Sequence, residues 1–128
     1  MGVVNFEGPM QGSTIKLDIA FYAETSGKEP VKVWLKDLEK HDRVIIGQDI
    51  KRVQIGWPLG MPLVKPLGSG LWEIRSSLGS RIARTIFTLY AGKIILLHGF
   101  IKKSQKIPAG EIELAKKRSK QLLRMDCL

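Results

Sequence analysis

Three segments in the second half of the chain show the short apolar patterns of β-strands. They cover 71–76, 81–90 and 93–102, and branched or aromatic residues recur in each at alternate positions or in short runs. Small polar residues and glycines separate the segments, and the Ala-Gly gap between the second and the third fits a tight hairpin turn. We therefore predict three consecutive antiparallel strands.

An earlier segment, 14–23, also alternates apolar with polar residues and predicts a strand with one buried face. Its apolar positions are Ile15, Leu17, Ile19 and Phe21. The pattern does not decide whether this strand lies at an edge of the sheet or between the later strands.

Apolar residues recur at helical spacing in the two segments that follow. Pro30 suits the first turn of a helix that runs to Lys40, and Asp42 is placed to cap a second helix that ends near Ile55. The two helices are predicted to form an antiparallel hairpin. Their predicted buried stripes are Val31, Trp34, Leu35 and Leu38 in the first, and Val44, Ile45, Ile46, Ile50 and Val53 in the second.

Prolines mark the two remaining boundaries. Three prolines and several glycines in Gly56–Gly70 argue against a long regular element, so this segment is predicted to be a connector. Pro108 suits the first turn of a last helix, with Glu111 and Glu113 near its start and basic residues further along. Its predicted buried stripe is Ile112, Ala115, Leu122 and Leu123.

The element order β-α-α-β-β-β-α predicts an α+β domain. We expect a four-stranded, mainly antiparallel sheet with an N-terminal helical hairpin and a C-terminal helix. A chain of 128 residues can bury one ordinary core and is short for two. We therefore expect a single domain over 14–128, preceded by a flexible arm over 1–13 that is rich in glycine.

The charge of the chain narrows the choice of partners. It has 21 lysines and arginines against 12 aspartates and glutamates, a formal net charge of +9, which attracts polyanions. Nucleic acid and an acidic protein segment fit this charge better than a membrane surface, because the pattern shows no basic amphipathic helix with an aromatic belt.

The sequence also predicts a location. No apolar run approaches the roughly 20 residues that span a bilayer, and the N-terminus lacks the pattern of a secretory signal. The single cysteine, Cys127, fits a reducing compartment. We expect a cytoplasmic protein that does not contact a membrane.

Arg84 stands between Ile82 and Ile86 in a predicted strand, where a guanidinium needs an anion to receive it. RNA phosphate is one such anion. Cleavage of RNA without a metal requires a base for the 2′-hydroxyl, stabilisation of a doubly charged phosphorane, and an acid for the leaving 5′-oxygen. We predict that Arg84 clamps the phosphate and that Arg75 forms the other side of the clamp. The alternatives for Arg84 are an ion pair with Glu73 or extension to the sheet edge.

A second basic group follows the last predicted strand. Lys102, Lys103 and Lys106 cluster where this strand ends, and together with Arg81 they are predicted to bind RNA. Lys103 and Lys106 are also predicted to act in catalysis, because neighbouring cations favour the neutral form of a lysine, which accepts a proton. The alternative is a solvated basic turn that binds phosphate without specificity.

The sequence leaves the acid unassigned. His98 has Leu96 and Phe100 as same-side neighbours, which favours a structural role, and the C-terminal tail offers only Asp126 and Cys127. The histidines and the cysteine show no zinc spacing, and no phosphate loop or dinucleotide fingerprint is found, so we predict no metal and no cofactor. The three tryptophans are predicted to pack in the core or at an interface.

Three strings in the second half of the chain form a specific combination. They are GLWEIR at Gly70–Arg75, the strand RIARTIFTLY with Arg84, and LLHGFIKKSQKIP followed by a helix with Glu111, Ala115 and Arg118. This combination resembles the HigB-like, phage-derived branch of the RelE/ParE toxin superfamily. The resemblance covers roughly residues 14–123 and is strongest over 65–118.

The resemblance implies a RelE-like fold and the toxin of a type II toxin–antitoxin pair. It implies a ribosome-dependent endonuclease that cuts mRNA in the ribosomal A site and inhibits translation. It also implies an antitoxin of the helix-turn-helix type as partner. Two alternatives stay open: a ParE-like toxin that inhibits DNA gyrase, and a non-enzymatic module that binds nucleic acid.

Overall fold

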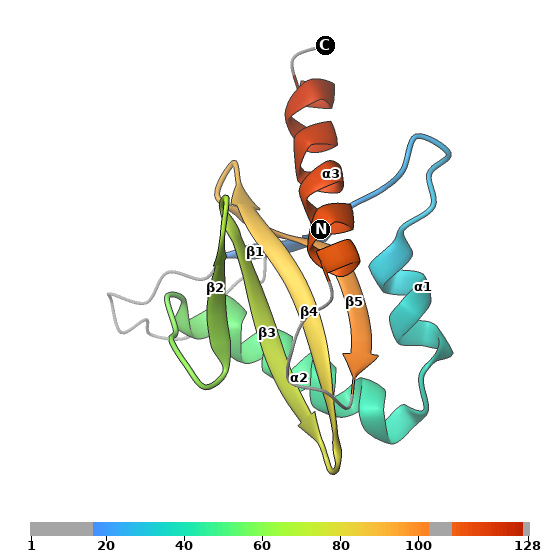
Figure 1. The fold of residues 1–128 in the computed structure, drawn as a ribbon, viewed down its shortest axis with the longest axis vertical. Helices are drawn as coiled ribbons and strands as arrows, with labels where there is room; N and C mark the ends of the chain where they lie inside the picture. Colours follow the sequence, from blue (N-terminus) through green and yellow to red (C-terminus); the bar gives the residue numbers. More distant parts are fainter. Residues whose placement is uncertain (1–16, 103–108, 127–128) are drawn as a thin grey trace, which may run out of the picture.

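The computed structural model describes residues 17–102 and 109–126, without the side chains of 124–126. Within these ranges the elements follow the order β1-α1-α2-β2-β3-β4-β5-α3 (Figure 1). The strands are β1 (Asp18–Phe21), β2 (Val64–Gly68), β3 (Leu71–Leu78), β4 (Arg81–Tyr90) and β5 (Lys93–Lys102). The helices are α1 (Pro30–Asp37), α2 (Lys40–Gly56) and α3 (Ala109–Asp126). The predicted arm over 1–13 and Pro108 lie outside the described residues.

The strands form one mixed sheet of five strands in the order β1-β5-β4-β3-β2. β2 to β5 pair as an antiparallel meander, which confirms the predicted pairing of the last three strands. β1 lies at the edge and runs parallel to β5, with Asp18 opposite Lys93. The prediction of four strands is therefore wrong by one, and the predicted element order lacks β2.

β2 lies inside the segment predicted to be a connector. It pairs with β3 from Val64 opposite Ile74 to Gly68 opposite Leu71, with an irregularity between Pro66 and Gly68. Pro66 has no N–H to donate, which an edge strand tolerates because its outer side needs no partner. The prolines therefore limit the length of this strand without preventing it.

The two N-terminal helices differ from their predicted bounds and arrangement. α1 ends at Asp37, and α2 begins at Lys40 with Glu39 as its N-cap residue. Asp42, the predicted cap, lies in the first turn of α2 and accepts hydrogen bonds from Arg81. α1 packs mainly on β5 and α2 on β3, so the two helices cover different strands and do not form the predicted hairpin.

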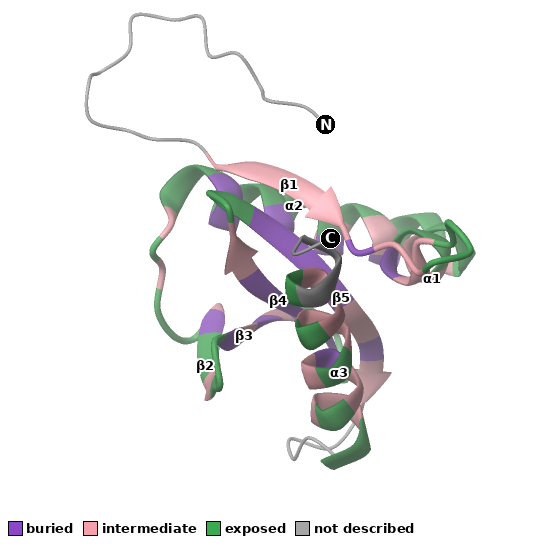
Figure 2. Ribbon diagram, turned by 90° about the horizontal axis from the view of Figure 1, so that it is seen from above, coloured by how far each residue is buried: buried purple, intermediate pink, exposed green. Residues whose placement is uncertain are grey.

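Two hydrophobic cores lie on the opposite faces of the sheet. α1 and α2 cover one face and α3 covers the other (Figure 2). The first core includes Val31, Ile46, Val53, Ile74, Phe87 and Leu96. The second includes Leu71, Ile86, Ile95, Leu97, Phe100 and Ala115. None of the described helices has the length and apolar character needed to cross a membrane.

The predicted apolar stripes are confirmed except at two positions. Val44 and Leu123 are 44% and 54% exposed. Val44 lies two residues before the buried Ile46, which is about 200° around a helix, so it faces away from the sheet. The other stripe residues of α2 and α3 are buried or pack on the cores: Ile45, Ile46, Ile50, Val53, Ile112, Ala115 and Leu122.

The indole of Trp34 fixes α1 on β5. A Cβ atom at Gly99 would lie 2.2 Å from two carbons of the Trp34 ring, far inside van der Waals contact. The missing side chain of Gly99 therefore permits the close approach of α1. Trp57 and Trp72 pack edge to face with their ring centroids 5.3 Å apart, which confirms the predicted packing role of these side chains.

Candidate nucleic-acid interface

Three of the predicted site residues lie close together on one face of the sheet, on the neighbouring strands β3, β4 and β5. Arg75 on β3 lies opposite Arg84 on β4, and Lys102 on β5 lies opposite Ile82, two residues along β4. Residues directly opposite in antiparallel strands share a face, as do residues two positions apart. We call Arg75, Arg84 and Lys102 the basic sheet face. It lies on the α3 side, where the ends of β3 and β4 extend beyond the helix (Figure 1).

Arg84 forms a buried ion pair with Glu73 at the centre of this face. Its Nη1 donates to both carboxylate oxygens at 2.9 Å, and the two side chains are 1% and 0% exposed. The alternative in which Arg84 pairs with Glu73 is thus the one observed. Arg84 as a phosphate clamp stays a prediction, and it requires this ion pair to open because the guanidinium does not reach solvent.

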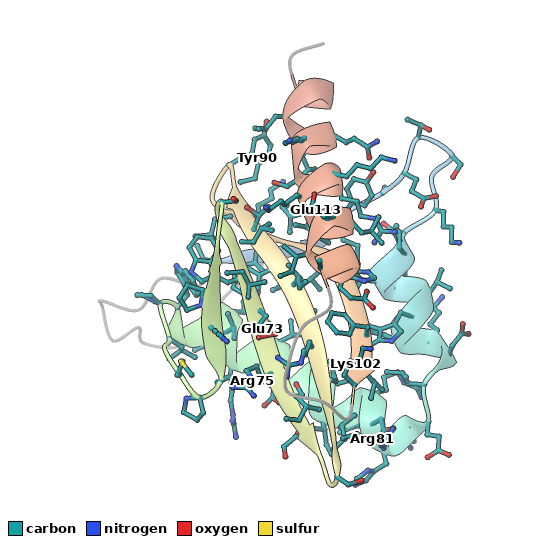
Figure 3. All side chains as sticks on the ribbon, in the orientation of Figure 1. Glu73, Arg75, Arg81, Tyr90, Lys102 and Glu113 are labelled. Atoms are coloured by element: carbon teal, nitrogen blue, oxygen red, sulfur yellow. The ribbon has the colours of Figure 1, made fainter. Side chains whose placement is uncertain are left out.

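Arg75 is partly exposed and lines a groove at the side of the sheet. The groove has a volume of about 450 Å³ and lies between α2, the residues before β2, and the end of the β3–β4 hairpin. Asp49, Arg52 and Leu63 are among its other lining residues. Arg75, labelled beside β3 in Figure 3, therefore belongs to the basic sheet face and also lies close to residues of α2.

Arg81 does not share the basic sheet face. It lies opposite Leu78, which belongs to the core beneath α2, and its Nη2 donates to the two oxygens of Asp42 at 3.1 and 3.3 Å. The structure therefore does not bring Arg81 and Lys102 together on one face, and RNA binding by Arg81 stays a prediction. Figure 3 shows Arg81 at the end of the hairpin and Lys102 at the end of β5. The predicted residues Lys103 and Lys106 lie outside the described residues.

His98 lies in a network that attaches α3 to β5. Its Nε2 contacts Oε1 of Glu111, while Nη1 of Arg118 donates to the Leu97 carbonyl at 2.7 Å and lies 3.5 Å from His98 Nδ1. A guanidinium can only donate, so His98 Nδ1 is the acceptor in the contact with Arg118. The other ring nitrogen, Nε2, is then the donor to the Glu111 carboxylate. This agrees with the predicted structural role of His98. Its partners Glu111 and Arg118 were not predicted, although their seven-residue spacing puts them on one helix face.

The described residues do not provide a candidate metal centre. Among the described side chains, those of 17–102 and 109–123, no group of three or more histidine, cysteine, aspartate or glutamate residues is close enough to hold a metal ion. The basic sheet face itself offers guanidinium and ammonium groups, which stabilise negative charge on phosphate.

Comparison with known proteins gives one family. Residues 33–120 match the family model described as "Phage derived protein Gp49-like (DUF891)". The matched region begins in α1, ends in α3 and contains every residue of the basic sheet face and of the groove beside it. No curated protein matches the chain.

Proposed function

Because the chain belongs to the Gp49-like family of phage-derived proteins, a RelE/HigB-like toxin family, we propose that it is a HigB-like, ribosome-dependent mRNA endonuclease. The family is associated with toxins of toxin–antitoxin pairs, which implies an antitoxin as partner. The proposed action is cleavage of mRNA on the ribosome, with arrest of translation. The proposed antitoxin is of the helix-turn-helix type.

One observation supports this proposal most directly. The strand register gathers Arg75, Arg84 and Lys102 on one sheet face, at the end of β5 where the basic segment 102–106 begins. Two partly exposed cations on rigid strands, Arg75 and Lys102, suit a phosphodiester, whose charge increases when the phosphorane forms. Arg84 is proposed to join them when its ion pair with Glu73 opens.

The exposure of the described residues supports a division of roles. Lys102 and Arg75 are partly exposed and are proposed to contact phosphate first, whereas Arg84 lies beneath them in its ion pair with Glu73. Lys103 and Lys106 are proposed as the catalytic lysines. His98 is not assigned a proton transfer, because both of its ring nitrogens already have partners.

The test is expression of the chain in a bacterium without the antitoxin, followed by mapping of transcript 5′ ends. The variant carries Lys102→Ala, Lys103→Ala and Lys106→Ala. A matched control carries Lys116→Ala, Lys117→Ala and Lys120→Ala, which removes the same charge from α3. We expect new ends inside translated codons with the parent and the control, and their loss with the variant.

Other outcomes lead to the alternatives. Growth arrest with double-strand DNA breaks and intact transcripts would contradict the nuclease and favour inhibition of DNA gyrase. Binding of RNA without arrest or cleavage would favour a non-enzymatic module. Equal cleavage by the parent and by both triple variants would show that the basic segment after β5 does not act in the reaction.

A further inference from the structure

The edge of β3 is open beyond the end of β2. The last paired residues are Val64 and Ile74, after which the Arg75 N–H donates to the Leu63 carbonyl at 2.8 Å. The chain before β2 then turns away from β3, because the Val64 N–H donates to the Gly60 carbonyl at 3.1 Å. No other described segment pairs with this edge of β3 past Arg75.

Ser77 presents its main-chain groups on this open edge. The N–H groups of residues two apart in a strand point to the same side, so Ser77 faces outward as Arg75 does. The β3–β4 hairpin leads to the same orientation. Leu78 and Arg81 flank its two-residue turn and form a hydrogen-bonded pair, so the next pair, Ser77 and Ile82, is of the non-hydrogen-bonded kind and the main-chain groups of Ser77 point away from β4. Ser77 is exposed and offers one donor and one acceptor to an added strand.

The groove beside this edge has the lining of a side-chain pocket. Its apolar lining residues are Ile45, Pro62, Leu63 and Ile82. The charged ones include Arg52 and Asp49, which lie 3.4 Å apart as an ion pair. A volume of about 450 Å³ is enough for one or two side chains of a bound peptide.

Arg75 is the groove cation that lacks a carboxylate. Its Nε is buried and has no hydrogen-bond acceptor among the described residues, and no described carboxylate forms an ion pair with its guanidinium. Arg75 lines the groove and is partly exposed, so its positive charge favours a ligand that supplies an anionic oxygen.

We propose that this edge and groove bind an extended, acidic segment of a partner protein, which adds to the sheet as a strand beside β3. The segment pairs with the main chain of Ser77, places an apolar side chain in the groove and gives a carboxylate to Arg75. A peptide fits better than RNA, because the edge presents the N–H and C=O of a strand residue and the groove beside it has four apolar lining residues. The proposal depends on the edge and the groove, and it stands whether or not the chain cleaves RNA.

The test begins with a phage-displayed library of random eight-residue peptides selected on the immobilised chain. The best peptide is synthesised and its affinity is measured by calorimetry for the parent, Arg75→Gln, Ser77→Pro and Lys65→Ala. Ser77→Pro removes the outward N–H without removing a donor to β4, and an edge position tolerates proline. Lys65→Ala removes one positive charge from exposed β2 and is the matched control.

We expect enriched peptides that alternate apolar residues with an aspartate or glutamate. Arg75→Gln and Ser77→Pro should each weaken binding about tenfold, Lys65→Ala should not, and the Ser77 amide resonance should shift on binding. Failure to enrich any peptide, or equal affinity for Arg75→Gln in a variant that melts like the parent, would overturn the proposal. So would an eight-nucleotide single-stranded RNA that shifts the Ser77 amide as strongly as the best peptide does, because the edge and the groove would then be a nucleic-acid site.

Discussion

Replacement of Arg84 by alanine should destabilise the protein strongly, because it leaves the carboxylate of Glu73 buried without its partner. The two side chains are 1% and 0% exposed, so solvent does not screen the charge that remains. Breaking such a buried pair costs about 3–5 kcal/mol. Since small domains are stable by only about 5–15 kcal/mol, Arg84→Ala should lose a large part of the free energy of unfolding.

Urea unfolding at equilibrium measures this loss, with the fluorescence of the packed Trp57 and Trp72 as the signal. Two controls test whether the loss comes from the buried, unpaired charge of Glu73 rather than from the loss of any ion pair. Arg52→Ala removes an ion pair whose arginine is 69% exposed, and it should cost less than about 1 kcal/mol. The double variant Glu73→Leu and Arg84→Met replaces both charges by apolar groups and should be at least as stable as the parent.

A loss of less than about 1 kcal/mol in Arg84→Ala would refute this reasoning, as would a double variant no more stable than Arg84→Ala. The result also affects the test of function. If Arg84→Ala unfolds easily, its loss of toxicity says nothing about catalysis. The exposed lysines are therefore the better probes of the reaction.

Gly99→Ala is expected to lower the free energy of unfolding by about 1–3 kcal/mol, because the added methyl group overlaps the Trp34 ring; an unchanged melting temperature would contradict this contact. Arg118→Met removes a donor between α3 and β5 and should increase hydrogen exchange of the α3 amides relative to those of α2. Unchanged protection of α3 would mean that apolar contacts alone hold the helix. Lys102→Ala should reduce the salt slope of single-stranded RNA binding by about 0.7, and an equal reduction in Lys116→Ala would indicate attraction by net charge alone.

The strand meander was predictable because its signals are local. The alternation of apolar residues and the short turns define 81–90 and 93–102, and the structure has both strands at these bounds. Ala91 and Gly92 have φ values of 53° and 76°, as the two central residues of a type I′ turn require. Local sequence was sufficient here because hairpin pairing and turn geometry depend on neighbouring residues.

β2 and the position of β1 were not predictable in the same way. The sequence of β2 contains Pro66 between Lys65 and Leu67, which is not typical of a strand. The extended conformation of this short segment is stabilised by its pairing with the edge of β3. β1 shows a clear strand pattern, but the choice of β5 as its parallel partner depends on how α1 and α2 cross the sheet. Both outcomes depend on tertiary contacts.

The sequence predicted which residues could belong to the candidate site, but it did not predict which side chains pair with one another there. The sequence identified Arg75, Arg84 and Lys102, and alternation along the strands puts them on one face. It named an ion pair with Glu73 as one alternative for Arg84 but did not decide between the alternatives, and it did not show that Arg81 binds Asp42 on the opposite face. Such choices between partners depend on which carboxylate lies nearest in space, and sequence spacing alone does not give that distance.

The parallel pairing of β1 with β5 has a consequence for the order in which the chain folds. β1 is the first described strand to be synthesised, but Asp18 pairs with Lys93, which is added 75 positions later. β2 to β5, by contrast, pair with their neighbours in sequence and can form as soon as each hairpin is complete. During translation β1 must wait for β5, so the sheet acquires its last strand only when most of the chain has left the ribosome.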